Sequence, residues 1–207
     1  MAVEAADGAR GRLIDVALSL RAILALRLDT LFTPQVVVQG RADCVGTEQD
    51  KLAQAVRDAP RYPSPAMKVK FQRPNPSTLQ ASFTGALHSR VDGGGSVLVA
   101  LYESGVITDC GRGENKGKSL LNDHVSLLND HVVRRRERVP AVRDGASARK
   151  AVSGSVQFPL WDDFRATKCG LVLFVQNSAL QVLGVQHFDL PDNALPGGGE
   201  EERSGEG

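Results

Sequence analysis

The stretch "MKVKFQRPNPSTLQASFT", residues 67–84, decides the fold class, because apolar and polar side chains alternate along it with a period of two. Met67, Val69 and Phe71 alternate with polar side chains, and the alternation returns from Leu79 onward. A period of two is typical of strands with one face buried and one in water. Both runs are therefore expected to form half-buried strands.

Further strands are expected on the carboxyl-terminal side. They are separated by Gly, Pro, Asp and Asn residues, which is the pattern of an antiparallel sandwich. We therefore expect a β-sandwich over residues 61–190 and a disordered tail over 191–207, which has almost nothing to bury. The expected strands are "SVLVALYE" (96–103), "AVSGSVQF" (151–158), "CGLVLFVQN" (169–177) and "QVLGVQHF" (181–188).

The amino-terminal side has a mixed pattern. Residues 12–28 predict an amphipathic helix. Three consecutive valines over 36–38 predict a fully buried strand, which is expected to pair antiparallel with a short strand over 43–45. A second helix is expected to open with Thr47 and Asp50 at the spacing of a capping box. "PRYPSP", residues 60–65, predicts a stiff linker between two modest domains.

Composition excludes several classes of function. The 207 residues carry 25 basic and 24 acidic side chains, so the formal net charge is +1. A charge this small gives the chain as a whole no electrostatic attraction to nucleic acid or to an anionic membrane. No uncharged run approaches membrane-spanning length. Cys44, Cys110 and Cys169 are distant from one another and lack a CxxC spacing, which favours free thiols in a reducing, cytoplasmic compartment.

Two motifs suggest chemistry that their context does not support. Gly117-Lys118-Ser119 matches the end of a phosphate-binding loop, but Arg112 stands where that motif needs glycine. The basic segment 134–150 has no aromatic residue for base stacking, so we interpret it as a solvated face or loop.

A tandem repeat follows the glycine-rich loop. "SLLNDHV" at 119–125 recurs at 126–132, and a single duplication is too short for a repeat architecture. His124 and His131 stand seven residues apart, about 10 Å along a helix, too far to share one metal ion. We therefore expect no metal and no cofactor. His88 and His187 are interpreted as surface or hydrogen-bonded histidines, and Trp161 as an anchor of the sandwich core.

Several stretches together carry a family resemblance. These include "LFTPQVVVQGRADCVG", "VALYESGVITDCGRGENKGKSLLNDH", "VVRR" and "CGLVLFVQNS". Over roughly residues 27–192 the chain resembles the thioredoxin-like domain-of-unknown-function 1223 family in its land-plant form. The resemblance implies an α+β fold, in which a partial thioredoxin-like α/β unit (residues 1–60) precedes an all-β antiparallel sandwich.

The resemblance also implies candidate sites. Thr33 and Pro34 would form a cis-proline loop, opposite a cysteine pair that this sequence lacks. A second candidate is a binding loop, for which we name the family motif residues Gly113, Glu114, Asn115, Gly117 and Arg134.

Three functions follow as hypotheses. The first is a binding or vestigial protein without oxidoreductase activity, and the second is a thiol-disulfide oxidoreductase whose CxxC segment is missing from this sequence. The third is a module that binds a small ligand or protein through the GENKG loop at 113–117. An open edge of the valine sheet would also favour self-association with a second chain.

Overall fold

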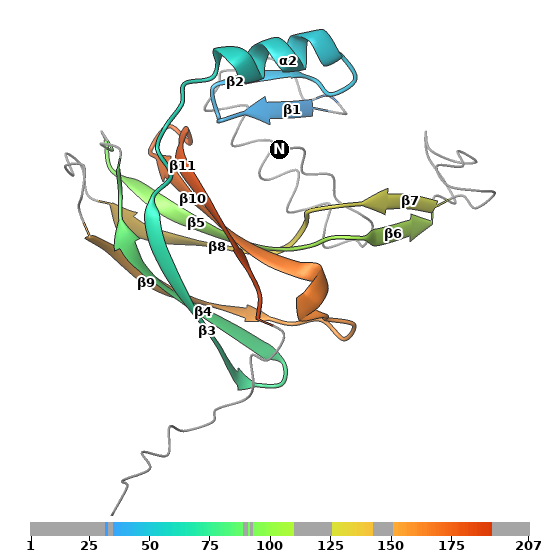
Figure 1. The fold of residues 1–207 in the computed structure, drawn as a ribbon, viewed down its shortest axis with the longest axis vertical. Helices are drawn as coiled ribbons and strands as arrows, with labels where there is room; N and C mark the ends of the chain where they lie inside the picture. The colour runs from blue at the N-terminus through green and yellow to red at the C-terminus, as the bar shows by residue number, and fades with distance from the viewer. Residues whose placement is uncertain are drawn as a thin grey trace, which may run out of the picture.

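The protein is built mainly from antiparallel strands (Figure 1). The computed structural model describes Phe32 and Val91 together with residues 35–88, 93–109, 126–142 and 151–191. Within these ranges the secondary structure consists of strands, one α-helix and one short 3-10 helix. The elements are β1 (Gln35–Val38), β2 (Ala42–Val45), α2 (Gln49–Asp58), β3 (Ala66–Asn75), β4 (Thr78–Ala86), β5 (Gly95–Glu103), β6 (Val106–Asp109), β7 (Ser126–Asn129), β8 (Val132–Val142), β9 (Ala151–Pro159), η1 (Ala166–Lys168), β10 (Cys169–Asn177) and β11 (Val182–Asp189).

Two sheets enclose the main core. One has the order β11-β10-β5-β8 and the other the order β3-β4-β9, and every pairing in both is antiparallel. The strands β8 and β9 lie beside each other and bring one edge of each sheet together (Figure 1). Side chains from both sheets therefore form one buried cluster between them.

The alternation in the sequence explains which side chains enter this core. Along β4 the buried residues are Leu79, Ala81 and Phe83, each separated by a more exposed neighbour. On the facing sheet Leu171 and Leu173 are fully buried. Burial of each large apolar side chain stabilises the folded state by about 1.5–3 kcal/mol. The strands predicted over 67–72, 79–84, 96–103, 151–158, 169–177 and 181–188 are confirmed.

The first described elements form a smaller unit. The strands β1 and β2 pair antiparallel, and α2 covers one face of this two-stranded sheet. Val36, Val38 and Cys44 are buried against apolar side chains of α2. The helix begins after Glu48, which makes no side-chain capping bond, so the predicted capping box from Thr47 is wrong.

The expected α+β fold with a partial thioredoxin-like α/β unit is wrong. The described chain is mostly β. The predicted antiparallel hairpin of 36–38 with 43–45 and the helix after it are confirmed, but no thioredoxin-like α/β arrangement occurs among the described residues. Three consecutive valines suggested a strand buried on both faces, but Val36 and Val38 are buried while Val37 is half-exposed. Such one-sided burial is what a hairpin covered by a single helix requires.

The small unit contacts the larger one through two tight turns. The β1–β2 turn has positive φ at Gln39 and Gly40, and the β10–β11 turn has positive φ at Leu180. The Val182 backbone N–H donates to the Gln39 carbonyl at 2.9 Å. A Cβ atom on Gly40 would stand 2.3 Å from the Leu180 carbonyl oxygen, so only glycine fits this close approach.

The linker between the two units is held in place. Ser64 Oγ donates to the Val185 carbonyl at 2.9 Å, and a Cβ on Gly184 would stand 2.9 Å from Pro65 Cδ. Just beyond it, the Gln186 side chain donates to the Met67 carbonyl and accepts from the Met67 N–H. This amide replaces a neighbouring strand at the edge of β3, where unpaired backbone groups would otherwise remain.

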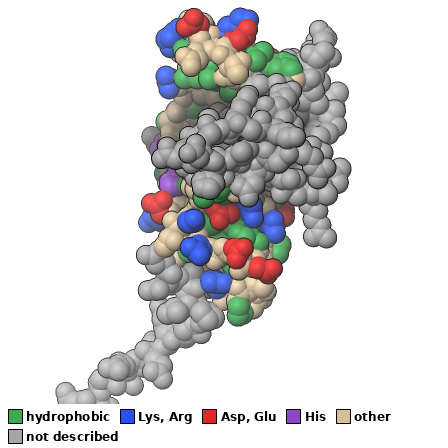
Figure 2. Space-filling view, turned by 90° about the vertical axis from the view of Figure 1, so that its right-hand side faces the viewer, with side chains coloured by type: hydrophobic (Ala, Val, Ile, Leu, Met, Phe, Trp, Pro, Cys, Tyr) green, Lys and Arg blue, Asp and Glu red, His purple; other side chains and the backbone are tan. Residues whose placement is uncertain are grey.

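Several predicted elements lie outside the described residues, namely the helix over 12–28 and the tail beyond Pro191. On the described surface, basic and acidic side chains are interspersed (Figure 2). This mixture matches the formal net charge of +1.

Candidate functional site

Most of the residues predicted to form a site lie outside the described chain. This holds for Thr33, Pro34 and Cys110 and for the loop residues Gly113, Glu114, Asn115 and Gly117. Of the predicted binding loop, only Arg134 is described, near the start of β8. The thiols of Cys44 and Cys169 are described, and both are buried and free.

Four strand ends meet at one end of the four-stranded sheet. The register pairs Tyr102 of β5 with Gly170 of β10, and Gly170 in turn with Asp189 of β11. On the other side Glu103 pairs with Val132 of β8. The quoted family stretches "VALYESG", "VVRR" and "CGLVLFVQNS" therefore converge here although they are far apart in sequence.

Tyr102 is the centre of the first side-chain group at this end, which we call the Tyr102 cluster: Tyr102, His131, Gly170, His187 and Asp189. The Tyr102 side chain is buried, and its hydroxyl lies 2.6 Å from His187 Nε2. The His131 ring lies against the phenol ring with 4.8 Å between centroids. The phenol lies over Gly170, where a Cβ atom would stand 2.3 Å from the hydroxyl.

The position of His131 depends on two facing turns. Asp130 Oδ1 accepts a hydrogen bond from the Gly105 N–H at 2.8 Å, and the His131 N–H donates to Ser104 Oγ at 3.3 Å. His131 has a φ of 58°, in the left-handed region that non-glycine residues seldom adopt. The turn therefore holds an exposed imidazole ring on the buried phenol.

The Tyr102 cluster is not a catalytic triad. Asp189 Oδ1 lies 3.6 Å from His187 Nε2, which is the same nitrogen that contacts the Tyr102 hydroxyl. A triad needs the carboxylate on one ring nitrogen and the nucleophile on the other. The Asp189 side chain is also 96% exposed, so water screens its charge.

The phenol of Tyr102 is also a poor nucleophile. Burial raises its pKa above the ordinary value, and the charge of Asp189 and the neighbouring Cys169 raise it further. The phenol therefore stays protonated at neutral pH. The hydroxyl and His187 Nε2 share one hydrogen bond, whose direction depends on the imidazole tautomer, and this bond orients the ring.

Cys169 does not have the environment of a reactive thiol. Burial raises its pKa to about 12, and the Glu103 carboxylate also raises it, while a backbone hydrogen bond with Arg165 and the charge of Arg134 lower it. A thiol must ionise to attack a disulfide. Cys169 therefore remains protonated and unreactive at neutral pH.

A second group adjoins the Tyr102 cluster, and we call it the Arg134 cluster: Glu103, Arg134, Arg135, Trp161 and Phe164. Arg134 Nε lies 3.4 Å from Glu103 Oε2. The guanidinium carbons of Arg134 and Arg135 lie 4.8 and 5.8 Å from the centre of the Trp161 ring. Phe164 meets the indole edge to face at 5.1 Å.

This arrangement refines the predicted role of Trp161. The side chain is half-buried against the main core, as an anchor would be, but its ring also carries two arginines. Its indole nitrogen is buried without a hydrogen-bond partner among the described residues. Guanidinium groups stack on aromatic faces through cation–π attraction, and each such contact contributes about 0.5–1 kcal/mol where exposed.

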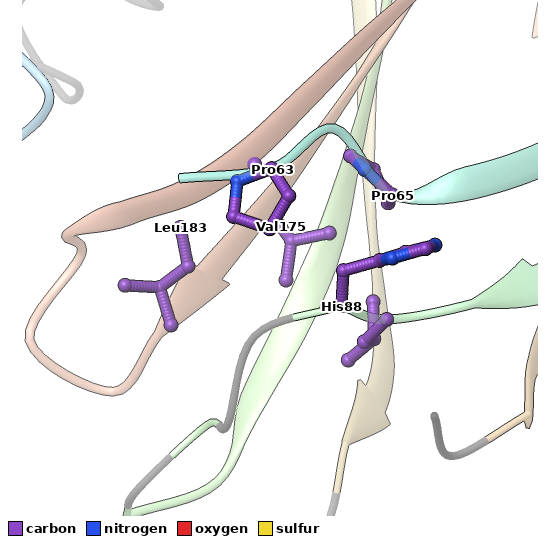
Figure 3. Close-up of a pocket in the computed structure, with 7 residues that line it drawn as sticks. Pro63, Pro65, His88, Val175 and Leu183 are labelled. Carbon is purple, nitrogen blue, oxygen red and sulfur yellow. The ribbon is translucent and has the colours of Figure 1, made fainter. Parts of the chain in front are cut away.

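A small pocket lies at the other end of the sheet (Figure 3). Pro63, Pro65, His88, Val175 and Leu183 line it together with Leu87 and Gly184. Its volume is about 10 Å³, room for a single water molecule. Small-molecule sites enclose hundreds of cubic ångströms, so this pocket does not bind a substrate.

Two further features bear on function. No group of three or more His, Cys, Asp or Glu side chains that could hold a metal ion occurs among the described residues. The one described α-helix, α2, is neither long nor apolar enough to span a membrane.

Comparison with known proteins settles the family. Residues 21–176 match the family described as "Protein of unknown function (DUF1223)". The chain belongs to this family. The family expected from the sequence is thus confirmed. A search of curated proteins finds no match.

A likeness of fold comes from a solved structure with a TM-score above 0.5. HBP35 of Porphyromonas gingivalis superposes on this DUF1223 chain with a TM-score of 0.54 and 13% identity, covering 87% of this chain. The chain spans 57% of the length of HBP35. A domain of the outer membrane lipoprotein Omp28 from the same organism gives a TM-score of 0.33 at 13% identity, covering 64% of this chain and 92% of that one.

Sequence reasoning missed Tyr102 and the role of His131. Tyr102 lies inside a strand pattern and becomes notable only when the register places Gly170 and His187 beside it. His131 had a signal, because it stands in the duplicated "SLLNDHV" segment.

Proposed function

We propose that this DUF1223 chain is a binding module for a small ligand, without thiol-disulfide exchange through its described cysteines. The ligand would contact the Tyr102 cluster together with Glu114 and Asn115 of the GENKG loop. The observation that carries the proposal is the Tyr102–His187 contact of 2.6 Å, which fixes an imidazole next to a buried phenol.

Pre-organisation supports binding at this end of the sheet. His187 is fixed by Tyr102, and His131 is fixed by the turn that bonds to Ser104 and Gly105. Rings held in this way lose little rotational freedom when they meet a ligand. Both histidines remain partly or largely open to solvent, so a ligand can reach the ring of His131 and the part of the His187 ring that does not contact Tyr102.

The chain path links the cluster to the GENKG loop. The turn at Ser104 and Gly105 leads directly into β6, and the segment 110–125 connects β6 to β7. That segment contains Glu114 and Asn115, and β7 leads back to His131. The loop thus begins and ends within a few residues of the cluster along the chain.

The redox alternative gains no support from the described thiols. Cys44 is buried beneath α2, and Cys169 stays protonated because its pKa is raised to about 12. Neither has a second described cysteine as a disulfide partner. An insulin-reduction assay on the full chain checks this point, and we expect no activity above the uncatalysed rate.

A ligand screen followed by variants tests the binding proposal. Thermal shift with a library of small metabolites should identify a ligand that raises Tm. We expect His131→Asn and Asn115→Ala each to abolish most of that shift, because asparagine tolerates the positive φ at position 131 while removing the ring.

The matched control is His88→Ala, which removes a histidine far from the Tyr102 cluster and should leave the ligand-induced shift unchanged. The absence of any ligand, or a shift that survives both His131→Asn and Asn115→Ala, would contradict the proposal.

A further inference from the structure

The Arg134 cluster offers hydrogen-bond donors that the described chain does not use. Arg134 contacts Glu103 through Nε alone, so its two terminal nitrogens have no hydrogen-bond partner within the described ranges. Arg135 uses Nε on the Pro159 carbonyl and Nη1 on the Arg134 carbonyl, which leaves Nη2. A guanidinium group has five N–H donors, so most of those on Arg134 have no partner among the described residues.

The cluster is also positively charged. The cluster holds two guanidinium groups and one carboxylate, that of Glu103, whose side chain is only 14% exposed. Asp162 and Asp163 follow Trp161 in sequence, but both are exposed and neither forms an ion pair with the arginines among the described residues. The balance of the cluster is therefore one positive charge.

The arginine side chains are held in position rather than free. The Trp161 ring supports Arg134 at 4.8 Å and Arg135 at 5.8 Å, and Phe164 supports the indole in turn. Glu103 holds Arg134 through Nε at 3.4 Å. The Arg134 side chain keeps 30% of its surface open, so a ligand can reach it.

We propose that Arg134 and Arg135, on the platform of Trp161, bind an oxyanion group such as a phosphate or carboxylate. This inference rests on the proposed binding function and names the chemical class of its ligand. The terminal nitrogens of Arg134 match the spacing of two oxygens of such a group, and bidentate contacts of this kind are the strong ones. Arg135 Nη2 would supply a further donor.

Fluorescence of Trp161 tests the inference directly, because it is the only tryptophan in the chain. The full chain is titrated with inorganic phosphate and separately with acetate, each at constant ionic strength maintained with sodium chloride. We expect a saturable change in Trp161 emission with at least one of the two anions. The anion that binds more tightly shows whether the site prefers a phosphate group or a carboxylate group.

Variants test whether the change in Trp161 emission depends on the forked N–H donors of the Arg134 guanidinium. Arg134→Gln should weaken binding about tenfold or more, because it removes charge-assisted hydrogen bonds. Arg134→Lys should also weaken it several-fold, since lysine keeps the charge but lacks the fork. Arg138→Gln, on the same strand but bonded to Gln176, should bind as the unaltered chain does.

The outcomes separate this inference from the proposed function. No saturable change with either anion, or equal binding by Arg134→Gln, overturns the oxyanion site. A neutral ligand that raises Tm and depends on His131 would then leave the binding function standing. Far-ultraviolet circular dichroism of each variant verifies folding, and Arg134→Lys keeps the test valid if Arg134→Gln unfolds.

Discussion

At the scale of single residues, Gly170 explains why Tyr102 can lie flat across the sheet. A Cβ atom at this position would stand 2.3 Å from the Tyr102 hydroxyl oxygen and 2.5 Å from the ring carbon that bears it. Gly170→Ala should therefore displace the phenol, break its contact with His187 and destabilise the fold by about 1–3 kcal/mol. Urea denaturation monitored by circular dichroism measures the change.

The control for this substitution is Gly105→Ala. A Cβ on Gly105 meets nothing within 4 Å, although its φ is +68°. This variant should lose only about 1 kcal/mol from the backbone conformation. A Gly170→Ala protein as stable as the unaltered chain would show that Tyr102 does not depend on the glycine.

The raised pKa of Cys169 leads us to expect that the free energy of unfolding depends on pH. Its folded pKa is raised from 9.0 to about 12, so the folded state holds its proton more tightly than the unfolded state does. The stability that this proton contributes is complete below pH 9 and is lost as the pH rises toward 12. Tyr102, whose pKa is also raised, acts in the same direction.

We therefore expect the free energy of unfolding to fall steeply above pH 9. Cys169→Ala should show a shallower fall, because one of the two titrating groups is gone. Chemical denaturation at a series of alkaline pH values measures both slopes. Equal slopes in the two proteins would show that Cys169 does not titrate as its burial indicates.

At the scale of elements, alternation predicted the core strands but not β8. The segment 134–150 is rich in arginine and suggested a solvated face or loop, yet its first part belongs to β8. An edge strand tolerates charged side chains on both faces and a proline such as Pro140, so no alternation remains to detect. Arg134 was therefore named from a family motif, while its partners Glu103 and Trp161 required the register.

The duplicated segment gives a prediction about loop length. The connection from β6 to β7 spans residues 110–125, and deleting 119–125 leaves an identical "SLLNDHV" to form β7 and the turn at His131. Loop closure depends only weakly on length, so the deletion should stabilise the fold by no more than about 0.5 kcal/mol.

Thermal unfolding and the His131-dependent ligand shift measure the result of this deletion. A loss of more than about 1 kcal/mol would mean that the first copy contributes contacts of its own.

At the scale of the whole molecule, the sequence misled because a local pattern does not specify what covers a strand. The run Val36–Val38 suggested a strand buried on both faces within a thioredoxin-like unit, whereas α2 covers only one face of its hairpin in the described chain. Among the described residues the core of this unit contains only three buried side chains, so its attachment to the larger sheets is important. That attachment depends on the two interlocked turns around Gly40 and Leu180.

Gly40→Ala should separate the two units. The added Cβ would stand 2.3 Å from the Leu180 carbonyl oxygen, and the φ of +66° adds strain that alanine resists. Losing this contact also leaves the Val182 N–H without the Gln39 carbonyl. We expect protease cleavage within the linker 60–65 to become at least several-fold faster, while the larger sheets keep their circular dichroism. The control is Gly105→Ala, because Gly105 has a similar φ but lies in open space. Equal cleavage of the two variants would show that backbone strain causes the faster cleavage, and that the fit of the two turns does not hold the units together.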